Sequence, residues 1–295
     1  MSSALFRSAF RQLRVHQWMK NCLVFVPLLA AHRLESAELL IKSALAFVAF
    51  SFLASTVYIL NDWLDIEADR RHPTKCKRPL PSGELSKSVA FLLGLALLSV
   101  TTLICFYLGD TGFAACLALY LGVNVFYSFK AKRMLGLDAV CLALLYTLRI
   151  LAGGAATQIP VSFWLMTFSS FFFLSLALLK RTSELVLSGD VEGSHRRAYN
   201  VGDIEVIVSL GTAASLVSGL VLLLYLNSPQ NAALYKSAEL LWFLLPILFY
   251  WKLRLWILAR RGQIAQDPVA YALKDRVTWI LILISGGVLA FASLG

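Results

Sequence analysis

Charged residues are scarce in this chain. Asp, Glu, Lys and Arg make up only 15% of its 295 residues, whereas soluble globular domains contain about 25%. Cysteine is also rare: the five cysteines are odd in number and include no Cys-x-x-Cys pair, which argues against a disulfide framework and against a zinc site. No linker, low-complexity segment or separate soluble region is visible, so we expect residues 1–295 to form a single domain.

Long apolar runs are abundant instead. Hydrophobic residues make up 59% of the chain, and its mean hydropathy is +0.72. Several runs approach the ~20 residues that a membrane-spanning helix needs. Nine are counted, at residues 21–33, 38–60, 88–108, 112–129, 137–157, 161–179, 204–226, 238–258 and 277–294. The sequence therefore predicts an all-α integral membrane protein with about nine transmembrane helices.

Lys and Arg residues are concentrated on one side of the expected membrane. The net charge is +10, which could indicate a nucleic-acid ligand. However, 23 Lys and Arg residues fall on one side of the expected helices, and only Arg33, Lys42 and Lys236 fall on the other. The positive-inside rule then places the N-terminus and the basic loops in the cytoplasm and the C-terminus outside. We therefore expect a protein of the bacterial plasma membrane and no nucleic-acid partner.

An acidic cluster ends the second apolar run. Asn61, Asp65 and Asp69 are spaced by four residues, so a continuing helix would align them on one face, with Asp62 on its flank. Ionisable groups at the end of a spanning helix are costly and usually functional. Hard oxygen ligands suit Mg²⁺, which takes one or two carboxylates and completes its shell with water and phosphate. The cluster predicts a site for Mg²⁺ and a diphosphate, although an ion-paired helix end is the plain alternative.

Cations follow this cluster at once. The loop after it contains Lys75, Lys77 and the stretch Arg78-Pro79-Leu80-Pro81-Ser82-Gly83. Proline ends the helix and restricts the loop, so these cations can be held above the metal. Arg supplies a planar fork for phosphate and Lys supplies a point charge.

At these residues the sequence resembles the UbiA superfamily of membrane prenyltransferases. The family motif N-D-x-x-D-x-x-x-D stands here at residues 61–69, and R-P-L-P-S-G resembles a second family stretch. The resemblance implies a helical bundle with a central cavity open to the cytoplasmic side. Members that prenylate aromatic rings carry a further D-x-x-x-D motif, but residues 178–185 contain Lys180, Arg181 and Glu184 instead.

This departure resembles the branch that handles phosphoribosyl groups, the decaprenyl-phosphate phosphoribosyltransferases. The similar stretches are Gln17-Trp18-Met19-Lys20-Asn21, His72-Pro73-Thr74-Lys75, Tyr127-Ser128 with Lys132, and Lys180-Arg181 with Glu184. The resemblance implies 5-phosphoribosyl diphosphate (PRPP) and a polyprenyl phosphate as substrates, Mg²⁺ as cofactor, and a place in cell-wall arabinan synthesis. Substrates of this kind need extra cations in the site to neutralise them, since each phosphate monoester carries about −1.5 to −2 charge.

Candidate residues follow from both arguments. Asp62, Asp65 and Asp69 are the catalytic candidates, and Asn61, Asp65 and Asp69 are the metal ligands. The substrate-binding candidates are Lys20, Lys75, Arg78, Tyr127, Lys132, Arg149, Lys180, Arg181 and Glu184. Lys20 could equally anchor the topology and Tyr127 could belong to the interfacial aromatic belt, whereas Glu184 could orient Lys180.

Arg149 lies inside an apolar run, so it should face the bundle interior and pair with an acid or a phosphate. Asp138, near the start of the same run, is one candidate partner.

Two other functions stay open. An aromatic prenyltransferase, such as a 4-hydroxybenzoate polyprenyltransferase, is favoured by the first motif. A membrane transporter is disfavoured because no internal inverted repeat is evident.

Overall fold

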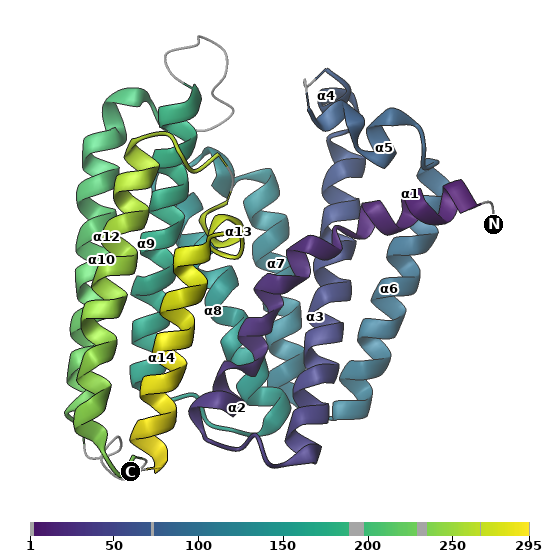
Figure 1. The fold of residues 1–295 in the computed structure, drawn as a ribbon. Coiled ribbons are helices and arrows are strands. Elements are labelled where there is room, and N and C mark those ends of the chain that lie inside the picture. The colour runs from purple at the N-terminus through teal and green to yellow at the C-terminus, as the bar shows by residue number, and fades with distance from the viewer. Residues whose placement is uncertain (1–2, 72–73, 189–197, 229–234, 266, 295) are drawn as a thin grey trace. The chain divides into compact units, whose positions relative to one another are not determined.

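The computed structural model describes residues 3–71, 74–188, 198–228, 235–265 and 267–294 (Figure 1). These residues form helices and no strand. Eight helices are long and apolar enough to cross a membrane. The described residues therefore have the fold of an all-α integral membrane protein. It divides into two compact units, with α8 (Leu137–Thr157) contributing its first half to one and its second half to the other.

Unit 1 comprises Met1–Phe129 and Leu148–Val161. Its helices are α1 (Ser3–Leu13), η1 (Val15–Phe25), α2 (Val26–Ala30), α3 (Ala37–Leu64), α4 (Ile66–Arg70), η2 (Lys75–Lys77), α5 (Pro79–Ser82), α6 (Lys87–Leu108) and α7 (Thr111–Phe129). Helix α3 is central and packs against α1, η1, α6 and α7. Small residues such as Ala46 and Ala49 are fully buried on it, which lets the neighbouring backbones approach closely.

The segment expected to form a first span, residues 21–33, is not one long helix. It lies in a 3₁₀ stretch, η1, followed by the short helix α2. Pro27 sits in the first turn of α2, and proline has no N–H with which to continue a preceding helix. Eleven 3₁₀ residues and five α-helical residues span about 30 Å, close to the thickness of the hydrocarbon core.

Unit 2 comprises Lys130–Thr147 and Ser162–Gly295. Its other helices are η3 (Ala131–Arg133), α9 (Phe163–Ser188), η4 (Val201–Asp203), α10 (Ile204–Leu226), η5 (Ala238–Phe243), α12 (Leu244–Arg260), α13 (Pro268–Ala272) and α14 (Arg276–Leu294). Helices α9, α10 and α12 pack on one another. A Cβ on Gly211 would lie 2.3 Å from the Trp256 ring, so only glycine allows α10 to approach α12 this closely.

Two of the 23 Lys and Arg residues that were expected on the cytoplasmic side, Lys252 and Arg254, lie inside a helix and not in a loop. Lys252 and Arg254 belong to α12. Arg254 pairs with Asp275 at 2.7 Å, and Lys252 is buried with its Nζ 3.9 Å from the centre of the Phe172 ring. Arg254 thus has an acidic partner within unit 2, Lys252 has an aromatic ring and the Phe172 carbonyl oxygen at 3.2 Å, and neither belongs to a loop.

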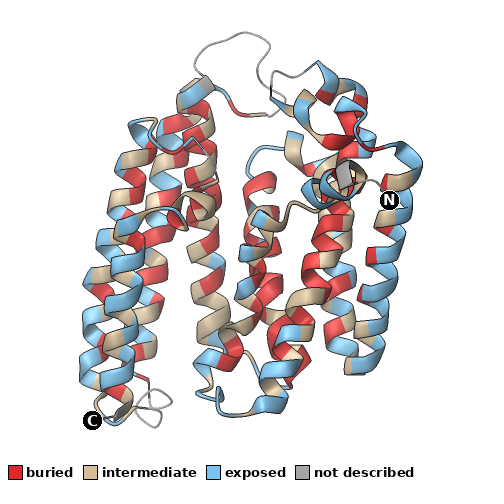
Figure 2. Ribbon diagram, turned by 45° about the vertical axis from the view of Figure 1, so that its right-hand side comes forward, coloured by how far each residue is buried: buried red, intermediate tan, exposed pale blue. Residues whose placement is uncertain are grey.

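The spanning helices expose large apolar side chains. Phe106 and Tyr107 on α6 are 80% and 77% exposed, and Leu283 on α14 is 72% exposed. Figure 2 shows exposed residues along the outer faces of the long helices. An apolar exposed face on a long apolar helix suits lipid contact, because a bilayer offers no water to solvate polar groups.

Candidate functional site

Asp62 is the centre of an ion-pair cluster in unit 1. Its carboxylate is 2% exposed and accepts hydrogen bonds from Gln12 Nε2 at 2.9 Å, Arg14 Nη2 at 2.6 and 2.7 Å, and Arg78 Nη1 at 2.9 Å. Two guanidinium groups thus share one carboxylate. Arg78 also donates to Asp69 Oδ2 at 2.7 Å. Asp62 therefore positions two cations beside the acidic motif, and its oxygens are already fully used.

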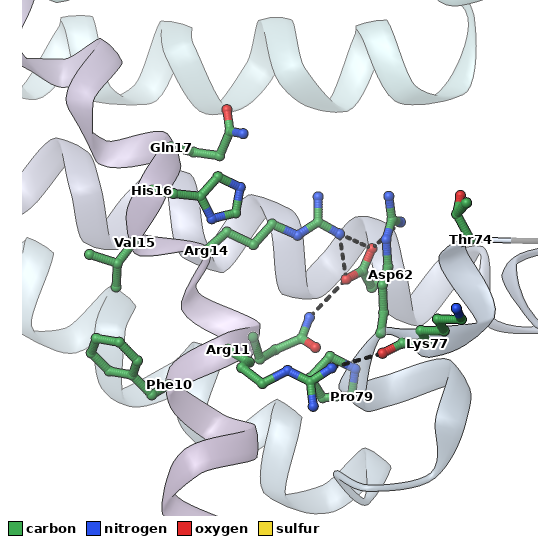
Figure 3. Close-up of a pocket in the computed structure, with 12 residues that line it drawn as sticks. Phe10, Arg11, Arg14, Val15, His16, Gln17, Asp62, Thr74, Lys77 and Pro79 are labelled. Carbon is green, nitrogen blue, oxygen red and sulfur yellow. Dashed lines mark hydrogen bonds and ion pairs between the residues drawn. The ribbon is translucent and has the colours of Figure 1, made fainter. Parts of the chain in front are cut away.

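Arg14 reaches Asp62 because of its backbone conformation. It joins α1 to η1 and adopts φ 53° and ψ 47°, the left-handed region that an arginine rarely occupies. This conformation costs about 1–3 kcal/mol and persists where surrounding contacts fix it. Here the Asp62 pair and the Tyr58 ring, 5.0 Å from the Arg14 guanidinium carbon, do so. Figure 3 shows Arg14 extending from the chain turn toward Asp62.

The predicted metal ligands keep their helical spacing. Helix α3 ends at Leu64, but the Asp65 N–H still donates to Asn61 O at 3.0 Å and the Asp69 N–H to Asp65 O at 2.7 Å. Asp69 is 1% exposed, and its Oδ1 accepts no hydrogen bond. The Nζ of Lys75 lies 3.7 Å from that oxygen.

This donor set fits a magnesium ion. Two carboxylates and one amide oxygen are hard ligands of the number that Mg²⁺ takes from a protein. Asp69 Oδ1 accepts no hydrogen bond, and the Lys75 ammonium stays 3.7 Å away, so this oxygen keeps its lone pairs for a closer cation. Asn61 Oδ1 accepts from Ser128 Oγ at 2.8 Å and keeps a second lone pair. In the described ranges no group of three or more His, Cys, Asp and Glu side chains is arranged for a metal.

A pocket of about 660 Å³ adjoins Asp62 in unit 1 (Figure 3). Its walls come from α1, the start of η1 and residues 74–79. Among its cationic side chains, Lys77 and Arg78 belong to the loop expected to hold cations above the metal, whereas Arg11 and Arg14 were expected to have no role in a site. Arg11 and Arg14 had been counted only as topological charge before the first span, and no local motif marks them.

Arg149 is held by neutral and aromatic groups of unit 1. Its Nε donates to Asn21 Oδ1 at 2.8 Å and its Nη2 to Tyr120 Oη at 3.1 Å. The rings of Tyr120 and Phe50 lie 5.0 and 5.8 Å from its guanidinium carbon, a cation–π arrangement. Arg149 is 5% exposed, as expected for a cation facing the protein interior. Its predicted phosphate contact stays a prediction.

Unit 2 contains a second ion-pair cluster around Arg181. The Arg181 Nε donates to Asp138, and its Nη1 donates to Glu184 Oε2 at 2.6 Å. Tyr199 Oη donates to the other Asp138 oxygen at 2.5 Å. Arg181 is 1% exposed and Asp138 is 0% exposed. Glu184 thus holds Arg181, not Lys180 as expected, and Asp138 pairs with Arg181 rather than with Arg149.

Tyr199 is strongly perturbed by this cluster. Burial, followed by the hydrogen bond to Asp138, raises the pKa of Tyr199 to about 12. The phenol is therefore held neutral as a donor. No sequence motif marks this residue, which lies 61 positions from Asp138.

Lys180 occupies a more accessible position in unit 2. Its side chain is 26% exposed, and its Nζ lies 3.0 Å from Asp267 Oδ2. Asp267 also caps α13 and accepts from Tyr146 Oη at 3.4 Å. Asp267 is therefore the orienting acid of Lys180. The remaining substrate-binding candidates, Lys20, Tyr127 and Lys132, are half-buried, and their roles stay predictions.

Comparisons with known proteins agree on the family. A model of the UbiA prenyltransferase family matches residues 22–281. The chain is 34% identical over 278 residues to nodulation protein NoeC of Azorhizobium caulinodans, covering 92% of this chain and 88% of that protein. It is 30% identical over 287 residues to decaprenyl-phosphate phosphoribosyltransferase of Mycolicibacterium smegmatis, covering 95% of this chain and 90% of that protein.

A third relative is longer. Uncharacterized protein y4nM of Sinorhizobium fredii is 35% identical over 273 residues, covering 92% of this chain and 53% of that protein. The chain therefore spans about half the length of y4nM.

Solved structures show the same fold. A UbiA homolog from Archaeoglobus fulgidus bound to GPP and Mg²⁺ superposes with a TM-score of 0.69 at 16% identity, covering 96% of this chain and 99% of that one. A digeranylgeranylglyceryl phosphate synthase superposes with a TM-score of 0.67 at 17% identity, covering 99% and 98%. With a family match over most of its length and the helical fold of its members, this integral membrane protein belongs to the UbiA prenyltransferase family.

Proposed function

We propose that this protein transfers the 5-phosphoribosyl group of PRPP to a polyprenyl phosphate such as decaprenyl phosphate. The products are polyprenyl-phosphoryl-5-phosphoribose and diphosphate. The proposal rests on one observation above others: Asp62 gathers two arginines beside the acidic motif, and the pocket next to them is lined by four cations. Relatives named decaprenyl-phosphate phosphoribosyltransferase, such as the Mycolicibacterium smegmatis protein, match 95% of the chain.

The charge balance favours phosphorylated substrates on both sides of the reaction. PRPP carries a diphosphate and a 5-phosphate, and the acceptor carries a further phosphate; each monoester adds about −1.5 to −2 charge. A prenyl transfer to an aromatic ring presents only one diphosphate. Lys180 supplies a further cation where aromatic prenyltransferases are expected to have acids.

Asn61, Asp65 and Asp69 would hold Mg²⁺, which would offset charge on the diphosphate leaving group. Arg78 would donate to phosphate oxygens, with Asp62 and Asp69 fixing its orientation. The bond between ribose C1 and the diphosphate oxygen breaks, and a bond from C1 to an acceptor phosphate oxygen forms. Because that oxygen is already anionic, the protein needs no strong general base and contributes orientation and electrostatic stabilisation.

The second candidate is an aromatic prenyltransferase. The superposition on a UbiA homolog bound to GPP and Mg²⁺ favours it at the level of fold. The residues that replace the second acidic motif disfavour it. The names of NoeC and y4nM specify no substrate.

Parallel reactions with purified protein test the two candidates. One contains Mg²⁺, PRPP and decaprenyl phosphate, and the other contains Mg²⁺, decaprenyl diphosphate and 4-hydroxybenzoate; mass spectrometry identifies the lipid products. We expect a phosphoribosyl lipid in the first reaction only. Asp65→Ala is the inactive reference, and Glu67→Gln, an exposed neighbour, is the matched active control. Prenylated benzoate would establish the second candidate. Products in neither reaction would direct attention to transport, tested by uptake into proteoliposomes.

We also propose that the N-terminus and the loop after α3 face the cytoplasm of the bacterial plasma membrane, where water-soluble PRPP is available. The asymmetric Lys and Arg distribution supports this orientation. Labelling of Cys76, which is half-buried in that loop, by a membrane-impermeant maleimide tests it. We expect labelling in inside-out vesicles and not in intact cells.

A further inference from the structure

The steps of the proposed transfer give an individual role to only one cation of the pocket beside Asp62, Arg78. Arg11, Arg14, Lys77 and Arg78 line it, and Asp62 is the one carboxylate among its described lining residues. The formal charge of these five side chains is therefore strongly positive. Arg11 is anchored by Glu84 at 2.8 Å and by the Lys77 carbonyl oxygen at 3.0 Å, which ties α1 to the loop that forms the opposite wall.

Several N–H groups in this pocket are available to a ligand. Arg14 contacts Asp62 through Nη2 alone, and Arg78 contacts Asp62 and Asp69 through Nη1 alone. A guanidinium has five N–H donors. The two remaining nitrogens of Arg14 and the two of Arg78 donate to no described residue. Lys77 is exposed and forms no ion pair within the described part of the chain.

We propose that this pocket binds a phosphate monoester through Arg14, Arg78 and Lys77. The remaining N–H groups of the two guanidinium groups and one ammonium group match a tetrahedral dianion with three terminal oxygens. Asp62 is a positioning residue, because it holds both arginines in place before a ligand arrives. The left-handed backbone of Arg14 serves the same purpose. A volume of about 660 Å³ admits a pentose phosphate or a lipid headgroup.

The assignment deepens, and rests on, the proposed phosphoribosyl transfer, which supplies two sources of this group. One is the 5-phosphate of PRPP, whose diphosphate would lie nearby because Arg78 contacts both Asp62 and Asp69. The other is the headgroup of the lipid acceptor. Helix α1 exposes Phe6 and Phe10 together with basic residues, as helices at a membrane surface do.

Direct binding measurements distinguish these sources. Purified protein is titrated with ribose 5-phosphate and, separately, with farnesyl phosphate, neither of which can undergo the transfer alone. The variants are Lys77→Met and Arg14→Lys, and Lys87→Met, an exposed cation at the start of α6 outside the pocket, is the control. Lys77→Met breaks no ion pair with a described residue, so it keeps the test valid if Arg14→Lys folds poorly.

We expect both variants to weaken the binding of one probe about tenfold, the loss of one charge-assisted hydrogen bond, and Lys87→Met to bind like the unmodified protein. An effect on ribose 5-phosphate assigns the pocket to the donor, and an effect on farnesyl phosphate assigns it to the acceptor. Equal affinity of Lys77→Met and the unmodified protein for both probes overturns the inference, as does no binding of either probe. Lys77-dependent binding without phosphoribosyl transfer would instead retain the pocket and reject the proposed function.

Discussion

Asp138→Asn should destabilise the protein strongly, because it removes the negative charge that faces the buried Arg181 guanidinium. Arg181 is 1% exposed and Asp138 is fully buried, so water cannot replace the lost charge. Removing one member of a buried ion pair typically costs about 3–5 kcal/mol. The Glu184 contact at 2.6 Å remains, but that side chain is 38% exposed and compensates only in part.

The expected cost is therefore at the lower end, about 3 kcal/mol, or a roughly 150-fold shift in the folding equilibrium. SDS-induced unfolding in mixed micelles, followed by the fluorescence of the seven tryptophans, measures it. Glu205→Gln, an exposed acid on α10, is the matched control and should change stability by less than about 0.5 kcal/mol.

A double-mutant cycle tests the stated cause. Adding Arg181→Gln to Asp138→Asn should cost less than the two single changes together, with a coupling energy of about 2 kcal/mol. Unfolding of Asp138→Asn at the same SDS fraction as the unmodified protein would refute the reasoning, and so would additive costs. A phosphate-binding role of Arg181 would appear separately, as a raised KM for PRPP in Arg181→Gln.

Three other predictions follow from single contacts. Asp69→Asn should lower Mg²⁺-dependent turnover at least about 100-fold, whereas Glu67→Gln should not; a magnesium titration of the rate measures both. Gly153→Ala should destabilise unit 1 by about 1–3 kcal/mol, because a Cβ there would lie 1.9 Å from the Val24 carbonyl oxygen; thermal unfolding in detergent checks this, and an unchanged melting temperature would contradict it. The pKa of Tyr199 is raised from 10.0 to about 12, so its stabilising effect is complete below pH 10 and is lost as the pH rises through 12; melting temperatures of the unmodified protein should fall more steeply over this range than those of Tyr199→Phe.

The sequence alone was sufficient to predict the membrane fold and the family. Apolar runs of about 20 residues identify spanning helices whatever their packing, and eight of the nine expected runs match spanning helices. The acidic motif lies within the consecutive residues 61–69, so its spacing is visible in the sequence without knowledge of the helix packing. Residues 21–33 differ from the other runs in their local backbone, because Pro27 separates the 3₁₀ stretch η1 from the short helix α2.

Tertiary structure decided which charges meet. Arg14 and Asp62 are 48 residues apart, and Arg181 and Asp138 are 43 apart. Hydropathy and spacing constrain only neighbours along one helix, whereas an ion pair between helices depends on their register and rotation. For this reason Arg14 was expected to serve topology alone, and only the packed helices show that it pairs with Asp62. Glu184 and Arg181 lie three residues apart on one helix, so spacing permitted that pair as well as Glu184 with Lys180, and the interhelical contact of Lys180 with Asp267 decided between them.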